Sequence, residues 1–282
     1  MTELSGKPAR WWLWALLVVG TLGGGGCAGV PKVQLTLPNR HVIVREQLVI
    51  HADFPVAARH RLFEELTARR ADLSRLLGLP VSDESIHVYL FDDSERFAGF
   101  MRLYHPEFPR RRAYFVETDT RLAVYAQWGD FVGEDLRHEV THGYLHSVLP
   151  NVPLWLDEGL AEYFELPRGS NGLNRPHLDM LLRWIQAGWR PDPRRLQRLD
   201  STAEMRLEDY AESWGWVHFL LNTRPEYKDL FSGYLADLRH EGSTEPLLPR
   251  LQRVLDDPGR EMTQHILDLG RRTKKTVVSP GI

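Results

Sequence analysis

The sequence predicts an α+β fold, in which a mixed sheet with helices is followed by a helical C-terminal subdomain. Between His41 and Ala126, short apolar and β-branched segments typical of strands alternate with helical patterns. After Pro153 every regular pattern is helical, so the strands belong to the first half of the chain. The chain has 282 residues, 43% of them hydrophobic, which is enough to bury a sizeable core.

Hydrophobic periodicity places the elements of the first half. Alternating β-branched residues predict a bent strand or hairpin over His41–His51, and leucines at helical spacing predict a helix over Pro55–Leu77. The next expected elements are a strand over Ile86–Phe91, a short helix from Ser94 to Leu103, and strands over Ala113–Val116 and Leu122–Ala126.

The second half is predicted to be helical throughout. Asp130 is the expected N-cap of a helix that carries His138 and His142. Pro153 opens a second helix, which Pro167 ends. Further helices are expected over 176–187, 207–222, 226–240, 245–256 and 259–270, with a flexible tail over 271–282.

The first 26 residues predict a secretory signal peptide. Lys7 and Arg10 precede an apolar run, Trp11–Leu22, which is shorter than the ~20 residues that a membrane span needs. Small residues follow, as at a cleavage site. We therefore expect residues 1–26 to be a targeting segment rather than part of the fold.

Cys27 is the only cysteine and follows these small residues. Its position resembles the cleavage site of a bacterial lipoprotein, although Gly24 stands where that pattern prefers Leu. The resemblance implies a lipid anchor on Cys27, and Ala28 after it favours the outer membrane of the cell envelope. Plain secretion and an uncleaved anchor are the alternatives. Residues 27–40 are expected to be a linker.

The segment His-Glu-Val-Thr-His at 138–142 predicts a metal site. His138 and His142 are one turn apart on one helical face, so both imidazoles can reach one ion. Zinc accepts imidazole nitrogens, and a catalytic site keeps one position open for water. Glu139 stands where a general base would face that water.

A third ligand is expected from the next helix. Glu158, Glu162 and Glu165 form an acidic stripe at helical spacing. A solvated helix face is the ordinary explanation of such a stripe. Beside the histidine pair, and with apolar residues around it, we interpret Glu158 as the third ligand.

The segment Trp155-Leu156-Asp157-Glu158-Gly159-Leu160-Ala161 resembles the Trp-Leu-x-Glu-Gly-x-Ala stretch of aminopeptidase N-type enzymes. The chain looks like a gluzincin zinc metallopeptidase of the peptidase MA-like group, which includes a domain of unknown function in bacterial lipoproteins. The resemblance implies that His138, His142 and Glu158 bind zinc, that Glu139 activates water, and that Glu162 orients a ligand histidine. The gap between His142 and Glu158 is shorter than in the aminopeptidases.

The same resemblance implies a zincin-like catalytic domain over 41–166 and a helical subdomain over 167–270. It also implies that the strand Leu122–Ala126 is an edge strand that pairs with extended substrate, an ordinary interior strand being the alternative. A tyrosine on a later helix stabilises the oxyanion in aminopeptidase N-type enzymes. Tyr210 lies in a comparable place, and His218 on the same helix is the alternative.

The metzincin pattern fails, because Leu145 and Val148 occupy the positions of its Gly and third His. His146 continues the histidine series, but it lies ~12 Å along the helix from His138, too far to share one ion. We expect His146 to have a structural or capping role.

Three hypotheses about function follow. The first is a zinc-dependent peptidase that acts on peptides or proteins, with an endopeptidase favoured over an exopeptidase. The second is a non-catalytic zinc-binding envelope lipoprotein that serves as a binding or scaffold module. The third is an accidental motif in a helical scaffold. The net charge of −3 argues against nucleic acid as a partner.

Overall fold

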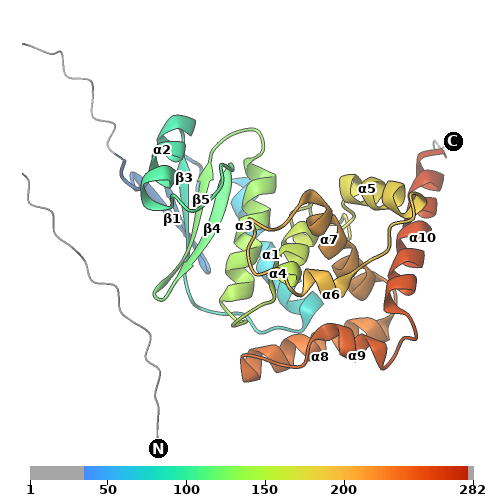
Figure 1. Ribbon diagram of the computed structural model, residues 1–282. Helices are drawn as coiled ribbons and strands as arrows, with labels where there is room; N and C mark the ends of the chain where they lie inside the picture. The colour runs from blue at the N-terminus through green and yellow to red at the C-terminus, as the bar shows by residue number, and fades with distance from the viewer. Residues whose placement is uncertain (1–34, 279–282) are drawn as a thin grey trace, which may run out of the picture. The chain divides into compact units, whose positions relative to one another are not determined.

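A computed structural model describes residues 35–278 of the chain (Figure 1). The expected signal peptide and the lipidation site at Cys27 lie outside the described residues. Between residues 35 and 278, no helix combines the length and the hydropathy that a bilayer span requires.

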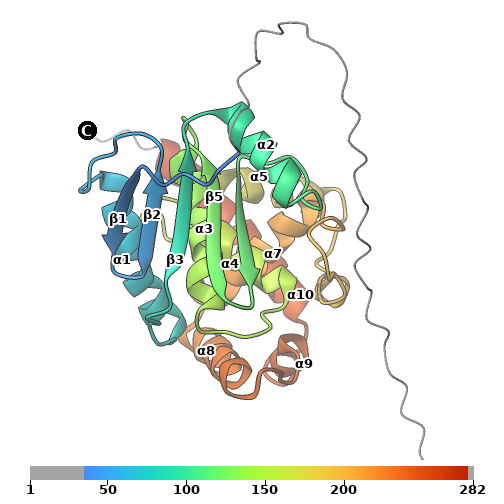
Figure 2. The ribbon, with the colours of Figure 1, turned by 90° about the vertical axis from the view of Figure 1, so that its left-hand side faces the viewer.

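One mixed sheet of five strands lies in the first half, so the predicted fold class is confirmed. The strands are β1 (His41–Arg45), β2 (Leu48–Ala52), β3 (Ile86–Phe91), β4 (Ala113–Thr118) and β5 (Arg121–Gln127). Their order is β1-β2-β3-β5-β4, with β2, β3 and β5 parallel and the two outer strands antiparallel to their neighbours. Figure 2 shows this order face on, with helices behind the sheet.

Ten helices are described. They are α1 (Arg61–Leu77), α2 (Ser94–Tyr104), α3 (Val132–His146), α4 (Leu154–Phe164), α5 (Arg175–Gln186), α6 (Pro193–Leu196), α7 (Leu207–Asn222), α8 (Pro225–Glu241), α9 (Leu247–Gln252) and α10 (Pro258–Val278). The short α6 was not predicted, α1 begins later than expected, and part of the predicted tail is helical as far as Val278.

The alternation of side chains along the central strands divides the apolar residues between two faces. In β3, Val88 and Leu90 belong to the main core, whereas Tyr89 and Phe91 belong to a second cluster that includes residues of α2. The helix α3 packs on the first face and α2 on the other (Figures 1 and 2). The main core continues into α4 and α7. The helix α3, which carries His138 and His142, therefore lies between the sheet and these later helices.

The helix α3 buries the side opposite its histidines, as its sequence pattern requires. Leu136 and Val140 are fully buried, and the hydroxyl of Tyr144 donates to the carbonyl of Leu66 at 3.0 Å. These contacts fix the rotation of α3 about its axis. The helix therefore presents His138 and His142 away from the sheet core, toward α4.

The predicted N-cap of α3 is wrong. Phe131 holds the N-cap position, and no side chain there accepts a capping hydrogen bond. Instead, Glu134 and Asp135 lie in the first turn, where negative charge interacts favourably with the exposed N–H groups. This charge stabilises the helix start without a side-chain cap from Asp130.

Candidate metal centre

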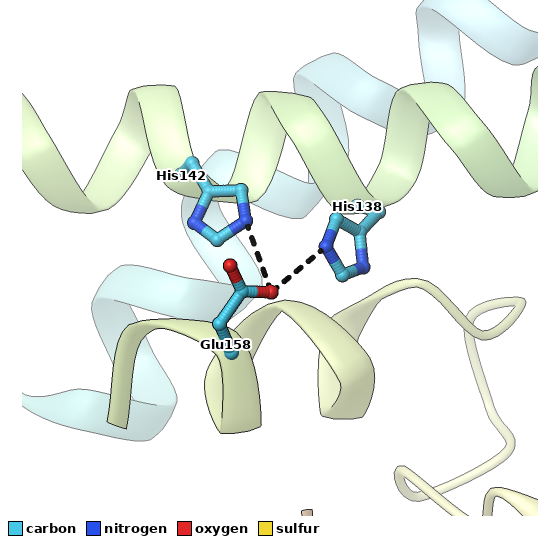
Figure 3. Close-up of side chains that lie close together, drawn as sticks. All are labelled: His138, His142 and Glu158. Atoms are coloured by element: carbon cyan, nitrogen blue, oxygen red, sulfur yellow. Dashed lines mark ion pairs between the residues drawn. The ribbon is translucent and has the colours of Figure 1, made fainter. Parts of the chain in front are cut away.

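Three side chains from two helices meet at one point, as predicted (Figure 3). The Oε2 atom of Glu158 lies 3.5 Å from Nε2 of His138 and 3.9 Å from Nε2 of His142. His142 and Glu158 are buried, and Glu158 Oε2 has no hydrogen-bond partner. An unpartnered buried carboxylate oxygen is costly, so the arrangement fits a cation that would bind all three groups.

The local sequence explains how α4 faces α3. Asn151 adopts a left-handed backbone conformation, with φ of 55°, and its side-chain amide donates to the carbonyl of Gly242 at 3.1 Å. Pro153 then starts α4, and Trp155 and Leu156 anchor the first turn of α4 in the core. The turn and these anchors bring Glu158 to the side of α4 that faces the histidines.

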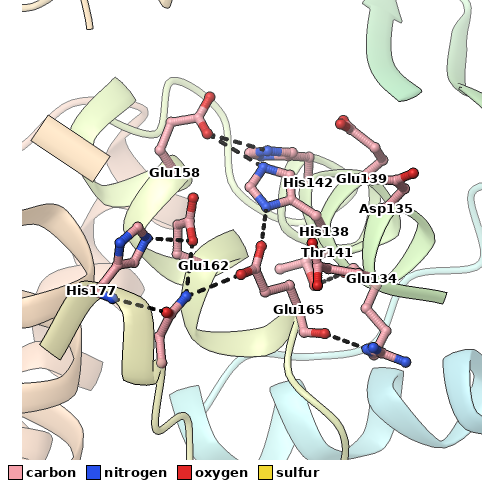
Figure 4. A network of polar contacts seen from close by, with 12 residues as sticks. Glu134, Asp135, His138, Glu139, Thr141, His142, Glu158, Glu162, Glu165 and His177 are labelled. Carbon is pink, nitrogen blue, oxygen red and sulfur yellow. Dashed lines mark hydrogen bonds and ion pairs between the residues drawn. The ribbon is translucent and has the colours of Figure 1, made fainter. Parts of the chain in front are cut away.

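Each histidine has a carboxylate beside its other ring nitrogen, and Figure 4 shows the one beside His138, Glu165. Nδ1 of His138 lies 3.0 Å from Oε2 of Glu165, and Nδ1 of His142 lies 2.9 Å from Oδ1 of Asp157. The hydrogen bond with Glu165 holds a proton on Nδ1 of His138 and leaves its Nε2 free to bind a metal, whereas the contact between Asp157 and His142 is an ion pair. Burial lowers the pKa of His138, but its interactions with the carboxylates of Glu158 and Glu165 outweigh burial and raise the pKa well above its ordinary value.

The predicted role of Glu162 needs correction. Its Oε2 atom lies 2.7 Å from Nε2 of His177 and accepts from the amide of Asn174 at 3.3 Å. Asn174 also donates to Glu165, at 3.1 Å. Glu162 points toward α5, whereas Glu165 at the C-cap of α4 reaches His138. Glu162 therefore helps to hold Glu165 through Asn174 and does not itself contact a ligand histidine.

Glu139 reaches the same cavity from α3. The cavity has a volume of about 160 Å³ and is lined by Glu139 together with His138, His142 and Glu158. Oε2 of Glu139 accepts a hydrogen bond of 2.7 Å from the backbone N–H of Phe115 in β4. Burial raises the pKa of Glu139, as a base that must accept a proton near neutral pH requires.

The prediction that Leu122–Ala126 is an edge strand is wrong, and the alternative, an interior strand, holds. Leu122–Ala126 lies in β5, which is paired with β3 on one side and β4 on the other, so it is interior. The strand at the edge beside Glu139 is β4, whose outer side pairs with no other described strand. The hairpin from β4 to β5 folds back so that the earlier strand takes the edge, which local sequence does not reveal.

Tyr210 lies beside this cavity, at the start of α7. Its hydroxyl oxygen accepts a hydrogen bond of 2.8 Å from Nη2 of Arg111, which lines the cavity. Burial and the charge of Glu158 raise the pKa of Tyr210. Because Arg111 donates to the phenolic oxygen, the hydroxyl proton is free to be donated elsewhere. Arg111 was not among the predicted site residues.

His218, the alternative to Tyr210, is buried elsewhere. Its Nδ1 atom lies 2.8 Å from Nε2 of His265, and its ring packs against Trp214 and Tyr163. Burial lowers the pKa of His218 to about 3. Neither side chain lines the metal cavity, but Tyr210 is hydrogen-bonded to Arg111, which does, so the geometry favours Tyr210 over His218.

His146 has the structural setting that was expected. Its two ring nitrogens lie 2.6 Å from Glu117 and 3.0 Å from Asp157. Because Asp157 also contacts His142, His146 helps to hold the carboxylate that orients a candidate ligand. Two further groups of side chains lie close enough together to hold a metal. One is His142, His146 and Asp157, and the other is His138, Glu162 and Glu165.

A family model matches part of the chain. A family model described as "Protein of unknown function (DUF1570)" matches residues 135–238. The matched segment contains the three candidate ligands, Glu139 and Tyr210. A search of curated proteins found no match.

Proposed function

We propose that this protein is a zinc-dependent peptidase. The observation that carries the proposal is the unpartnered, buried Oε2 atom of Glu158, which faces Nε2 of both His138 and His142 at the metal cavity. Two imidazoles and one carboxylate are a ligand set that catalytic zinc uses, with a fourth position open. Glu139 lies in the same cavity without ligating, which supports catalysis over simple metal storage.

Zinc in this cavity would polarise the substrate carbonyl and lower the pKa of water to about 7. The protein's own side chains would transfer the proton and stabilise the oxyanion. Glu139 would take the proton of the attacking water and deliver it to the leaving amine. The hydroxyl of Tyr210, oriented by Arg111, would donate to the oxyanion as negative charge develops there.

The free edge of β4 would bind the substrate backbone. An extended peptide that adds to this edge would lie along the wall that carries Phe115, whose N–H already holds Glu139. Such pairing would position a peptide bond next to the base. This arrangement favours extended segments of peptides or unfolded proteins as substrates.

We also propose that the protein acts at the cell envelope, with a lipid on Cys27 as its membrane anchor. The basis is the apolar leader followed by small residues and a single cysteine.

Two variants of the full chain test the proposal. Glu139→Gln should retain one zinc per chain by elemental analysis but lose the ability to cleave a mixed peptide library, because only the base is removed. Glu158→Ala should lose both zinc and cleavage, whereas the exposed Glu64→Ala should lose neither. Full zinc retention in Glu158→Ala would overturn the ligand assignment. Zinc binding without cleavage by the wild type would support the non-catalytic alternative.

A further inference from the structure

A second and larger cavity adjoins the metal cavity. It has a volume of about 690 Å³ and lies between α2 and the segment that leads into β4. The two cavities share three lining residues, Phe108, Arg111 and Tyr114. A peptide with its scissile bond at the metal cavity would therefore have a neighbouring residue beside the larger one.

The walls of this larger cavity combine apolar surface with positive charge. Phe97, Met101 and Phe108 supply apolar surface, and three arginines, Arg102, Arg110 and Arg111, also line it. The one carboxylate in the lining is that of Glu95. This local excess of positive charge contrasts with the net charge of −3 of the whole chain.

Arg110 and Arg111 lack the direct carboxylate contact that their neighbour Arg112 makes, although Arg111 also interacts electrostatically with Glu158 and Glu139. Arg112, the next residue along, pairs with Asp135 at 2.8 Å. Within residues 35–278, no ion pair is formed by Arg110 or Arg111, and the guanidinium of Arg111 donates to the neutral hydroxyl of Tyr210. Exposed cations that form no ion pair beside a cavity attract an anionic group of a ligand.

The segment that carries these arginines is held in place. The backbone N–H of Arg111 donates to the hydroxyl of Tyr114 at 2.6 Å, and this hydroxyl donates in turn to the carbonyl of Pro109. Tyr114 is buried beneath the segment. A binding group on a fixed segment loses less conformational entropy when it engages a ligand.

We propose that the larger cavity is a specificity subsite, in which Arg110 and Arg111 bind a carboxylate of the substrate close to the scissile bond. A guanidinium matches a carboxylate with two parallel hydrogen bonds, and the apolar walls accommodate the methylene groups behind it. The carboxylate belongs to an Asp or Glu side chain or to the C-terminus of the peptide. This inference rests on the proposed peptidase function.

The test uses matched peptides and one charge-removing variant of the full, zinc-loaded chain. Peptides that differ only in Glu versus Gln, with amidated C-termini, report on the side-chain carboxylate. A neutral peptide with a free or an amidated C-terminus reports on the terminal carboxylate. We expect the wild type to prefer the acidic member of one pair by about 10-fold or more in kcat/KM, as charged hydrogen bonds contribute.

Arg110→Gln should reduce this preference at least several-fold, because it removes one of the two guanidiniums proposed to bind the carboxylate. The change should spare the metal cavity, because Arg110 lines only the larger cavity. Arg239→Gln is the control, since this exposed arginine of α8 lines neither cavity. It should leave both the preference and the turnover unchanged. An unaltered preference in Arg110→Gln, or no preference for either carboxylate in the wild type, would overturn the subsite.

A binding measurement separates the subsite from the proposed catalysis. Fluorescently labelled versions of the same peptides are titrated into zinc-loaded Glu139→Gln chain, with and without Arg110→Gln. Preferential binding of the acidic peptide that depends on Arg110 supports the subsite, even if the wild type cleaves no peptide and the peptidase proposal fails. Cleavage by the wild type without such a binding preference rejects the subsite and leaves the peptidase proposal standing.

Discussion

Replacing Gly159 by alanine should destabilise the protein, although alanine normally favours a helix. A Cβ atom at this position of α4 would lie 2.6 Å from the carbonyl oxygen of Ser213 in α7 and 3.0 Å from a methyl group of Val217. Ordinary contacts begin at 3.4 Å, so the two helices would have to separate by about 0.8 Å. Because the oxygen belongs to the backbone, it cannot turn aside.

The magnitude follows from two opposing effects. Overpacking costs about 1–3 kcal/mol, and a rigid backbone contact places Gly159→Ala near the upper end. The gain in helix propensity offsets about 1 kcal/mol. The net loss is therefore about 2 kcal/mol, or about 4–8 °C in Tm for a chain of this size. Because α4 carries Glu158, a proposed zinc ligand, zinc affinity should fall as well.

The matched control is Gly233→Ala in α8, where the same change meets no atom within 4 Å. This variant should gain up to about 1 kcal/mol from helix propensity alone. Urea unfolding of both variants, with a chelator present to remove the contribution of metal binding, measures the two effects. If Gly159→Ala proves as stable as the wild type, the close contact between α4 and α7 is wrong.

Three further predictions concern catalysis, pH and location. Tyr210→Phe should lower kcat by ~10²–10³ and leave the zinc content unchanged, because one oxyanion donor is lost; peptide turnover within a few-fold of wild type would reject this role. Burial holds the pKa of His218 at about 3 and of His265 at about 4, below the ordinary value near 6.5. Since the unfolded chain takes up these protons first, stability should fall as pH drops from about 6.5 to about 4. In His265→Gln, the free energy of unfolding measured with urea should fall less between pH 7 and pH 5 than in the wild type. A fall as large as in the wild type would contradict the role given to the buried histidines. Cys27→Ser should release the protein from the membrane fraction of its host if lipid is the anchor; unchanged partitioning in a fractionation assay would indicate an uncleaved leader instead.

The fold class could be predicted because the period of the hydrophobic pattern is a local property. All strand patterns lie before residue 128, where they alternate with helical patterns, and every regular pattern after it is helical. Helix limits were predicted closely where strong periodicity coincided with clear stops, as over 207–222. The start of α3 was not predicted correctly. The acidic residues Glu134 and Asp135 in its first turn take the place of the side-chain cap that was expected from Asp130.

The sequence alone determined which residues are candidates for binding the metal. His138 and His142 face the same way because they are one helical turn apart, and no tertiary contact is needed to know it. Only the tertiary structure decided that Glu165 rather than Glu162 supports His138, that β4 rather than β5 is the edge, and that Arg111 meets Tyr210 from 99 residues away. These contacts depend on how separate elements pack, and a local pattern specifies each element but not its neighbours.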